Sequence, residues 1–262
     1  METTPPERND PLFNTSLDKG LAVLSAFRGR RSLSLREVAE ALGITKSSAQ
    51  RIVYTLEKLG FVRRPEPGAK YQLTLKMMEL GFAYLSNDSL IEVGGAFLSE
   101  LTNATGETCN LTEPLETNMV YVSRVVSPQF IPIHLAIGSR IPMYCTASGR
   151  AYLSALPEEE ALALITASPL EKHTYWTETD PEKIMMLLVQ AKRDGFASNK
   201  EEYILGDMTI GAPVMGRSGR PLGAVHVVAP TSRWTLESAC AKLAPHVIKS
   251  ARGIGTAVHA AT

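Results

Sequence analysis

Residues 35–62 read LREVAEALGITKSSAQRIVYTLEKLGFV, and they contain two short stretches of helical periodicity joined by a glycine. In the first stretch the apolar residues recur on one helical face, Ser34 stands at the N-cap position and Gly43 follows the last turn. The second stretch begins at Thr45, carries its own apolar face and ends at Gly60. Two helices joined by a glycine turn predict a helix-turn-helix unit.

The segments on either side extend this unit. Apolar residues at helical spacing over residues 17–27 predict a preceding helix with Ser16 as its N-cap, and residues 1–16 are expected to form a disordered arm. After the second helix, FVRR (61–64) and KYQLT (70–74) flank the turn segment PEPGA and predict a short β-hairpin. A hairpin in this place makes the helix-turn-helix a winged one.

The rest of the chain alternates strands and helices and predicts an α+β fold with an at least partly antiparallel sheet. The expected strands are residues 107–113, 119–126, 130–135, 211–215 and 221–228. The expected helices are residues 90–105, 147–155, 157–167, 181–194 and 236–258, the last kinked or broken at Pro245. The resulting domains are the arm 1–16, a winged helix-turn-helix DNA-binding domain 17–76, a linker helix 77–89 and a C-terminal domain 90–262.

The composition is that of a soluble globular protein, with 44% hydrophobic and 21% charged residues. Neither a secretion signal nor an apolar run long enough to cross a membrane is present in the sequence, and the three cysteines stand far apart. We therefore expect a reduced, cytoplasmic protein with no membrane partner. The net charge is zero, but residues 17–76 hold 12 Lys and Arg against 5 Asp and Glu, so this module carries about +7 and the remainder about −7. Such an asymmetry favours a polyanion as partner.

The second helix of a helix-turn-helix places its exposed N-terminal residues in the major groove of DNA. Gln50 can pair with adenine, and Arg51 or Lys46 can reach guanine or a phosphate. The expected contacts with double-stranded DNA are Thr45, Lys46, Ser47, Ser48, Gln50, Arg51 and Tyr54 on the helix and Arg63, Arg64 and Lys70 on the wing. The alternative is that Gln50 and Arg51 belong only to the solvated face of a buried helix.

Over nearly its whole length, from about Leu17 to Val258, the sequence resembles the IclR family of bacterial transcriptional regulators. At the front, the matching stretches are SLDKGLAVLSAF, the helix-turn-helix quoted above and KYQLT. At the back they are IGSRIPMYCTASGRAYLSALP, DGFASNKEEYILGDMTIGAPV and GRSGRPLGAVHVVAPTSR. The resemblance implies a DNA-binding domain, a linker helix and a GAF-like α/β effector-binding domain. It also implies a homodimer held mainly through the N-terminal part, which in this family often assembles further into tetramers, and control of catabolic genes through a palindromic operator.

The resemblance further implies an effector pocket on one side of the C-terminal sheet. Carried onto this chain, its residues are Phe130, Ala147, Ser148, Asn199, Asp207, Thr209, His226 and Val228. Small-acid binders of the family have small polar residues where His226 and Val228 stand, and an acid in place of Asn199. With Met143 and Tyr144 nearby, these departures suggest a larger effector, an aromatic carboxylate.

Part of this pocket follows from the residues themselves. CTASGRAYL predicts a loop that enters a helix, whose N–H groups at Ala147, Ser148 and Gly149 could hold a carboxylate against the helix dipole. Phe130, Met143 and Val228 would hold the apolar body, and His226 or Asn199 would bond a polar group at the far end. His226 stands in an apolar strand and needs a hydrogen-bond partner. That partner is either the effector or another residue of the core.

The sequence gives no indication of catalysis. The string around Ser148 lacks the first glycine of a nucleophile elbow, and GRSGR lacks the Lys-Ser/Thr of a phosphate loop. Histidines and cysteines show no metal-ligand spacing, so we expect no metal and no cofactor. Cys109 and Cys145 are interpreted as core residues. Two alternatives to an acid-sensing regulator remain: a DNA-binding regulator without a small-molecule effector, and an enzyme that acts on small carboxylates.

Overall fold

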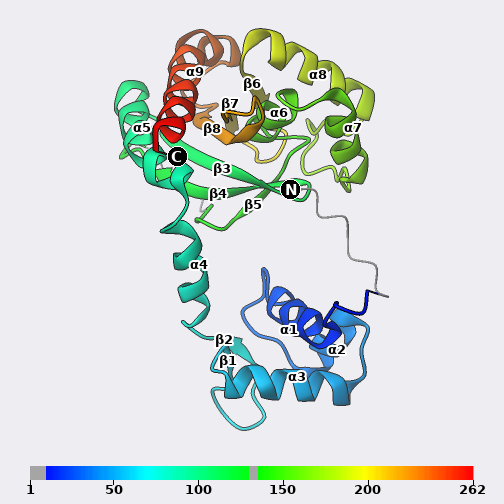
Figure 1. Ribbon diagram of the computed structural model, residues 1–262. Coiled ribbons are helices and arrows are strands. Elements are labelled where there is room, and N and C mark those ends of the chain that lie inside the picture. Colours follow the sequence, from blue (N-terminus) through cyan, green and yellow to red (C-terminus); the bar gives the residue numbers. More distant parts are fainter. Residues whose placement is uncertain (1–9, 130–134, 262) are drawn as a thin grey trace. The chain divides into compact units, whose positions relative to one another are not determined.

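The computed structural model describes residues 10–129 and 135–261, and the chain divides into two compact units, Met1–Tyr84 and Leu85–Thr262 (Figure 1). Each unit has a hydrophobic core of its own. The division falls at the end of helix α4 (Met77–Leu85), inside the segment that the sequence assigns to the linker.

The N-terminal unit packs three helices around a small core. They are α1 (Thr15–Ser25), α2 (Leu35–Leu42) and α3 (Lys46–Lys58). The side chains at the centre are Val23, Val38, Ala49 and Val53, each exposed by 1% or less. Burying a Val or Leu side chain contributes roughly 1.5–3 kcal/mol, so these few residues supply much of the stability of the unit.

Side-chain caps fix the ends of these helices. Ser34 and Glu37 form a capping box at α2, in which Glu37 accepts the Ser34 N–H at 2.7 Å and donates its own N–H to the Ser34 hydroxyl at 3.2 Å. Gly43 ends α2 with a φ of 63°, as predicted, and lets the chain turn into α3. The prediction of Ser16 as the cap of α1 was wrong. Asn14 takes this position, since its side chain accepts the N–H groups of Ser16 and Leu17 at 3.1 Å.

The predicted wing is confirmed. Strands β1 (Val62–Arg63) and β2 (Gln72–Leu73) pair antiparallel. Tyr71, just before β2, exchanges both backbone hydrogen bonds with Leu33, at 2.9 and 2.8 Å. The hairpin is therefore tied to the loop that precedes α2, and the wing keeps a fixed place beside the two helices of the helix-turn-helix.

Helix α4 differs from the helices around it because it has no buried residue. Its large apolar side chains are more than half exposed: Met78, Leu80, Phe82 and Tyr84. Asp88 then caps α5 (Ser89–Thr105) by accepting the N–H groups of Leu90 and Ile91. A row of exposed apolar side chains of this size is typical of a surface that another chain covers.

In the described residues, the C-terminal unit is built on one sheet of six strands in the order β5-β4-β3-β8-β7-β6, with every neighbouring pair antiparallel (Figure 1). The strands are β3 (Thr108–Leu115), β4 (Asn118–Val125), β5 (Arg140–Pro142), β6 (Ala197–Lys200), β7 (Asp207–Met215) and β8 (Pro221–Pro230). Strands β5 and β6 were not predicted, and β7 begins four residues before its predicted start at Gly211. Of the expected strand 130–135, residues 130–134 lie outside the described residues.

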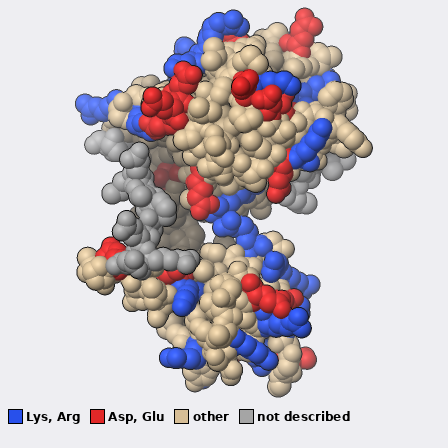
Figure 2. Space-filling model, turned by 90° about the vertical axis from the view of Figure 1, so that its right-hand side faces the viewer, with Lys and Arg blue, Asp and Glu red and all other residues tan. Residues whose placement is uncertain are grey.

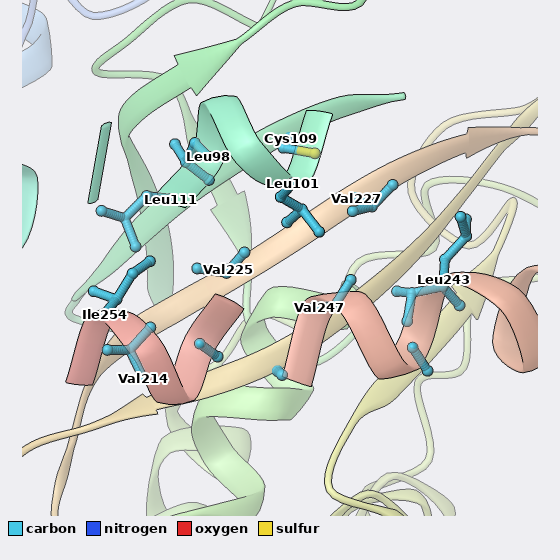
Figure 3. Packing of buried hydrophobic residues seen from close by; sticks show 14 of the residues in the cluster. Leu98, Leu101, Cys109, Leu111, Val214, Val225, Val227, Leu243, Val247 and Ile254 are labelled. Atoms are coloured by element: carbon cyan, nitrogen blue, oxygen red, sulfur yellow. The ribbon is translucent and has the colours of Figure 1, made fainter. Parts of the chain in front are cut away.

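Helices cover both faces of this sheet. On one face α5 and α9 (Leu236–Ala261) bury an apolar core, in which Leu98, Leu111, Val225 and Val247 meet (Figure 3). Helix α9 continues through Pro245, so of the two expectations, a kink or a break, the break is absent. The other face carries α6 (Ala147–Ser154), α7 (Glu158–Ala167) and α8 (Pro181–Asp194). Because strand residues alternate between faces, the partners of α6 are the residues of β7 and β8 that point away from α9.

Candidate functional site

The exposed face of α3 carries the residues expected to read DNA. Ala49, Val53 and Leu56 are buried against the other helices, which leaves Lys46, Ser47, Gln50, Arg51 and Tyr54 in solvent. Ser47, Gln50, Arg51, Tyr54 and Thr55 line a shallow hollow on this face. The side chains with base-reading chemistry therefore share one open surface, as the helical spacing predicts.

Two residues predicted to contact DNA, Thr45 and Ser48, take part in the N-terminal cap of α3. The Thr45 hydroxyl accepts the N–H of Ser48 at 3.2 Å and lies 3.0 Å from the Ser47 hydroxyl. Ser48 itself is half-buried. Thr45 thus acts as the N-cap of α3, and it orients the first turn of the helix that Lys46 and Gln50 project from.

The basic residues of the wing differ in whether their side chains already contact other side chains of the protein. Arg63 is exposed, whereas Arg64 stacks on the Tyr71 ring at 4.4 Å and donates to its hydroxyl. Lys70 pairs with Glu37 at 2.7 Å, and this contact, with the backbone and hydroxyl of Ser34, lowers the pKa of Glu37 to about 2. The positive charge of Lys70 is therefore partly cancelled by a carboxylate that stays ionised.

Lys and Arg side chains spread over the visible face of the N-terminal unit in Figure 2. This agrees with the excess of about seven positive charges in residues 17–76. The basic module, the exposed helix face and the wing are the features of a DNA-binding domain.

The second candidate site lies on the α6 face of the C-terminal sheet. The strand register aligns Gly211 of β7, His226 of β8, Asn110 of β3 and Arg124 of β4 in one row across the sheet. In the row beside it, Asn199 of β6 stands next to Thr209 of β7 and Val228 of β8. Polar residues on the buried face of a sheet need partners, so these rows form a polar floor beneath α6.

Gly211 brings α6 down onto this floor. A Cβ at Gly211 would lie 2.9 Å from the carbonyl carbon and oxygen of Ala147 and 3.0 Å from the nitrogen of Ser148. Only a glycine allows such an approach between strand and helix. Since Gly211 is the cross-strand neighbour of His226, the first turn of α6 with Ser148 lies beside that histidine.

Five of the ten predicted effector residues line one small cavity: Ser148, Asn199, Asp207, Thr209 and His226. Phe130 lies outside the described residues. The other four do not line the cavity: Met143, Ala147, Gly149 and Val228. Met143 belongs to the same apolar cluster as the cavity residues Tyr121 and Ile141, and its predicted contact with the ligand stays a prediction. The N–H of Gly149 is not free for a carboxylate, because it donates to the Thr146 hydroxyl at 3.3 Å.

The cavity has further lining residues that the sequence analysis missed: Tyr121, Leu135, Ile141, Thr146, Tyr203 and Ile204. Tyr121 comes from β4, and Tyr203 and Ile204 come from the loop between β6 and β7. For Tyr121, the available signal was a tyrosine in the otherwise mostly apolar stretch MVYV of β4. Its partners depend on strand register, which the sequence does not display.

His226 is buried and bonded at one nitrogen. Its Nε2 lies 3.2 Å from the Asn110 amide nitrogen and 3.2 Å from the Tyr121 hydroxyl. Its Nδ1 has no partner among residues 10–129 and 135–261. Burial, aided by the positive charge of Arg124, lowers the pKa of His226 to about 3, so the imidazole is neutral at physiological pH. The alternative of a core partner was right for one nitrogen only.

Asp207 and Ser148 also present unpaired polar atoms. One carboxyl oxygen of Asp207 and the hydroxyl of Ser148 have no partner in the described part of the chain. Burial raises the pKa of Asp207 to about 7, although the Met208 N–H and Arg124 act in the opposite direction. Asn199, in contrast, is committed to the protein, since it donates to the Cys145 carbonyl and accepts from Thr209.

The free space between these side chains is only ≈ 20 Å³. This holds about one water molecule, whereas sites for organic ligands typically measure ~300–1,000 Å³. An effector of several carbon atoms therefore requires the lining side chains to move apart.

A buried ion pair holds the loop over the cavity. Arg150 on α6 is 2% exposed, and its two terminal nitrogens each lie 2.6 Å from a carboxylate oxygen of Glu202. Its Nε donates to the Tyr144 carbonyl at 2.8 Å. Glu202 stands next to Tyr203, so this pair fixes the loop residues that close the site.

Two of the three thiols, those of the buried Cys109 and Cys145, are unsuited to nucleophilic chemistry. Burial raises the pKa of Cys109 to about 11 and that of Cys145 to about 12, so both are protonated at neutral pH. Within residues 10–129 and 135–261, no three His, Cys, Asp or Glu side chains gather as a metal site.

Two family profiles match the chain, "IclR helix-turn-helix domain" over residues 16–66 and "Bacterial transcriptional regulator IclR C-terminal" over residues 82–256. The chain belongs to the IclR family. It is a DNA-binding transcriptional regulator of the type that this family comprises. In the described residues no helix is long and apolar enough to cross a membrane.

Relatives of this IclR protein match it over most of their length. The Pca regulon regulatory protein of Pseudomonas putida is 29% identical over 94% of this chain and 84% of its own. The p-hydroxybenzoate hydroxylase transcriptional activator of Acinetobacter baylyi is 30% identical over 84% of this chain and 83% of its own.

Solved structures share the fold. IclR of Thermotoga maritima has a TM-score of 0.70 at 26% identity and covers 93% of this chain and 98% of its own. An IclR family transcriptional regulator from Brucella abortus has a TM-score of 0.82 at 25% identity, with 96% and 95% covered.

Proposed function

We propose that this IclR regulator binds a pseudo-palindromic operator as a homodimer and responds to a small organic acid, an aromatic carboxylate, bound between α6 and β8. The observation that carries the proposal is that Ser148 Oγ, His226 Nδ1 and one carboxyl oxygen of Asp207 lie in residues that line one cavity and have no partner among the described residues. Buried polar groups in proteins are nearly always bonded, so a ligand is the natural partner.

The known relatives support the aromatic class. One regulates a pca regulon and another activates p-hydroxybenzoate hydroxylase. An IclR homologue from Microbacterium hydrocarbonoxydans, 22% identical and with a TM-score of 0.74, was solved as a complex with 4-hydroxybenzoate. We therefore choose 4-hydroxybenzoate as the first probe, and regulation of catabolic genes as the context.

The experiment is a thermal shift of the full protein against substituted benzoates, followed by fluorescence anisotropy on operator DNA. A benzoate that binds should raise the melting temperature and change operator affinity, because coupling requires different ligand affinities in the two states. Binding without a change in operator affinity would contradict a regulatory role for the site. Turnover of a benzoate would instead favour an enzyme.

The size of the cavity favours a second candidate, a DNA-binding regulator without a small-molecule effector. With ≈ 20 Å³ of space the pocket is nearly filled by the protein's own side chains. If no acid stabilises the protein while operator binding is intact, this second function is the correct one.

The proposed dimer rests on helix α4. Its exposed Met78, Leu80, Phe82 and Tyr84 form an apolar surface that a second copy would bury. Light scattering should therefore give at least twice the 28.5 kDa of one chain at micromolar concentration. Phe82→Asp should shift the mass toward one chain, whereas a wild-type mass of 28.5 kDa would refute the dimer.

A further inference from the structure

One buried histidine has its proton position dictated by its neighbours. His226 Nε2 faces the Asn110 amide nitrogen and the Tyr121 hydroxyl, each at 3.2 Å. In this orientation the Asn110 amide presents its NH₂ group, which can only donate a hydrogen bond, so Nε2 accepts. A neutral imidazole carries one proton, and that proton is then on Nδ1.

The Nδ1–H group is a buried donor that has no partner in the described part of the chain. His226 is 1% exposed and lines the cavity, and Nδ1 finds no partner among the described residues. The Ser148 hydroxyl, also 1% exposed and also without a partner there, lines the same cavity. Gly211 sets the two side by side, because it pairs with His226 and touches the backbone of Ser148. The cavity thus presents two adjacent donors.

The charged side chains around the cavity indicate which kind of acceptor these two donors would bind. Arg124 stands in the same cross-strand row, next to Asn110, and its positive charge favours an anion at this place. Asp207 also lines the cavity, and because burial raises its pKa to about 7, its carboxyl is mostly protonated below that pH and then does not repel an anion. A carboxylate accepts hydrogen bonds at both oxygens and donates none. His226 was predicted to bond a polar group at the far end of the ligand, whereas its position beside Ser148 favours the carboxylate end.

We propose that His226, held as the Nδ1–H tautomer by Asn110 and Tyr121, is the specificity-determining donor that binds the effector carboxylate together with Ser148. Asn110 and Tyr121 are positioning residues, which act only through the histidine. This inference rests on the proposed function, in which the cavity binds the acid.

The first test needs no ligand. Histidine labelled with ¹⁵N in the full-length protein should show, by NMR, one imidazole with a protonated Nδ1 and a bare Nε2, and His226→Asn should remove that signal. Asn110→Asp places an acceptor opposite Nε2 and should move the proton there. A protonated Nε2 in the wild type would overturn the inference and leave the proposed function standing.

The second test uses 4-hydroxybenzoate and its neutral amide, 4-hydroxybenzamide, in calorimetry. The wild type should prefer the benzoate, and His226→Leu should weaken its binding roughly ten- to hundredfold, the usual effect of losing a hydrogen bond to a charged group. His226→Asn keeps an N–H near the position of Nδ1 and should stay within a few-fold of the wild type. Asn110→Asp should weaken binding although His226 is intact.

The outcomes separate the two proposals. Equal binding by the wild type and His226→Leu would overturn the donor role alone. Failure of every benzoate to bind the wild type would overturn both the donor role and the proposed function. Melting temperatures of each variant show whether a loss of binding comes from loss of the fold.

Discussion

Gly211 and Ala147 approach so closely that a Cβ on Gly211 would lie 2.9 Å from the Ala147 carbonyl. The contact joins β7 to the first turn of α6, and it determines how near Ser148 lies to the polar floor of the sheet. Backbone on both sides leaves no flexible side chain that could give way.

Gly211→Ala should therefore destabilise the protein by roughly 1–3 kcal/mol, as overpacking of a core does. The matched control is Gly95→Ala in α5, where nothing lies within 4 Å of the added Cβ. That change should be neutral or stabilise the helix by up to about 1 kcal/mol. Urea denaturation measures both, and equal effects would show that the close approach does not matter.

On the DNA side, Gln50→Ala should reduce affinity by about 1–3 kcal/mol and relax the preference at one base position in each half-site. Gln50 is exposed on α3 in the hollow with Ser47 and Arg51, and its amide can bond two atoms of adenine. Anisotropy with a set of operator variants measures the effect. If affinity fell evenly over all variants, Gln50 would be a backbone contact.

Two basic residues of the wing, Arg63 and Lys70, should contribute differently to DNA binding. Arg63→Ala should weaken DNA binding evenly across sequences and reduce the salt slope by about 1, since one phosphate contact is lost. Lys70→Ala should have a smaller effect, because Glu37 lies 2.7 Å from Lys70 and offsets its charge. Titrations at several salt concentrations measure both slopes, and equal slopes would contradict the difference in pairing.

Arg150→Met should cost roughly 3–5 kcal/mol, because it leaves the Glu202 carboxylate without its buried partner. The double variant Arg150→Met, Glu202→Leu should recover most of this loss. As a control, Arg220→Met breaks the exposed pair with Glu160 and should cost about 0–1 kcal/mol. If the buried and exposed pairs proved equally costly to break, the ion pair would not hold the loop.

The raised pKa of Asp207 predicts that the stability of the protein depends on pH. The pKa of Asp207 is raised from 3.8 to about 7 in the folded protein, so the folded state binds the proton more tightly than the unfolded chain. Its contribution to stability is present below about pH 4 and is lost as the pH rises through about 7. Asp207→Asn should therefore gain stability relative to the wild type over that range. Urea denaturation at several pH values between about 4 and 7 measures the difference in stability between Asp207→Asn and the wild type. A difference that does not change with pH would contradict the prediction.

The helix-turn-helix could be predicted from sequence because its signals are local. Ser34, Gly43 and Thr45 each act within a few residues of their own position. The cap of α1 was predicted wrongly as Ser16, because Asn14, two residues earlier, has a side-chain oxygen that accepts the N–H groups of Ser16 and Leu17. Strand β6, ASNK, has no apolar alternation and is a strand only because β7 pairs with it.

The site was predictable only in part, since it depends on contacts between distant residues. His226 was recognised as a polar residue in an apolar strand, but its partners Asn110 and Tyr121 are 116 and 105 residues away. Met143 is near α6 in sequence and belongs to the same apolar cluster as Tyr121 and Ile141, yet it does not line the cavity. Register and side-chain direction follow from the whole sheet, which no single segment of the sequence specifies.

The small size of the cavity has a consequence for the sensing threshold. An effector that binds only an opened form has its apparent affinity reduced by the fraction of molecules that are open. If the open form becomes ten times rarer, the effector concentration needed for half-saturation rises tenfold. Substitutions that loosen the packing of α6 or release the loop at Glu202 would then tune the concentration at which the regulator responds, without touching a single atom of the ligand.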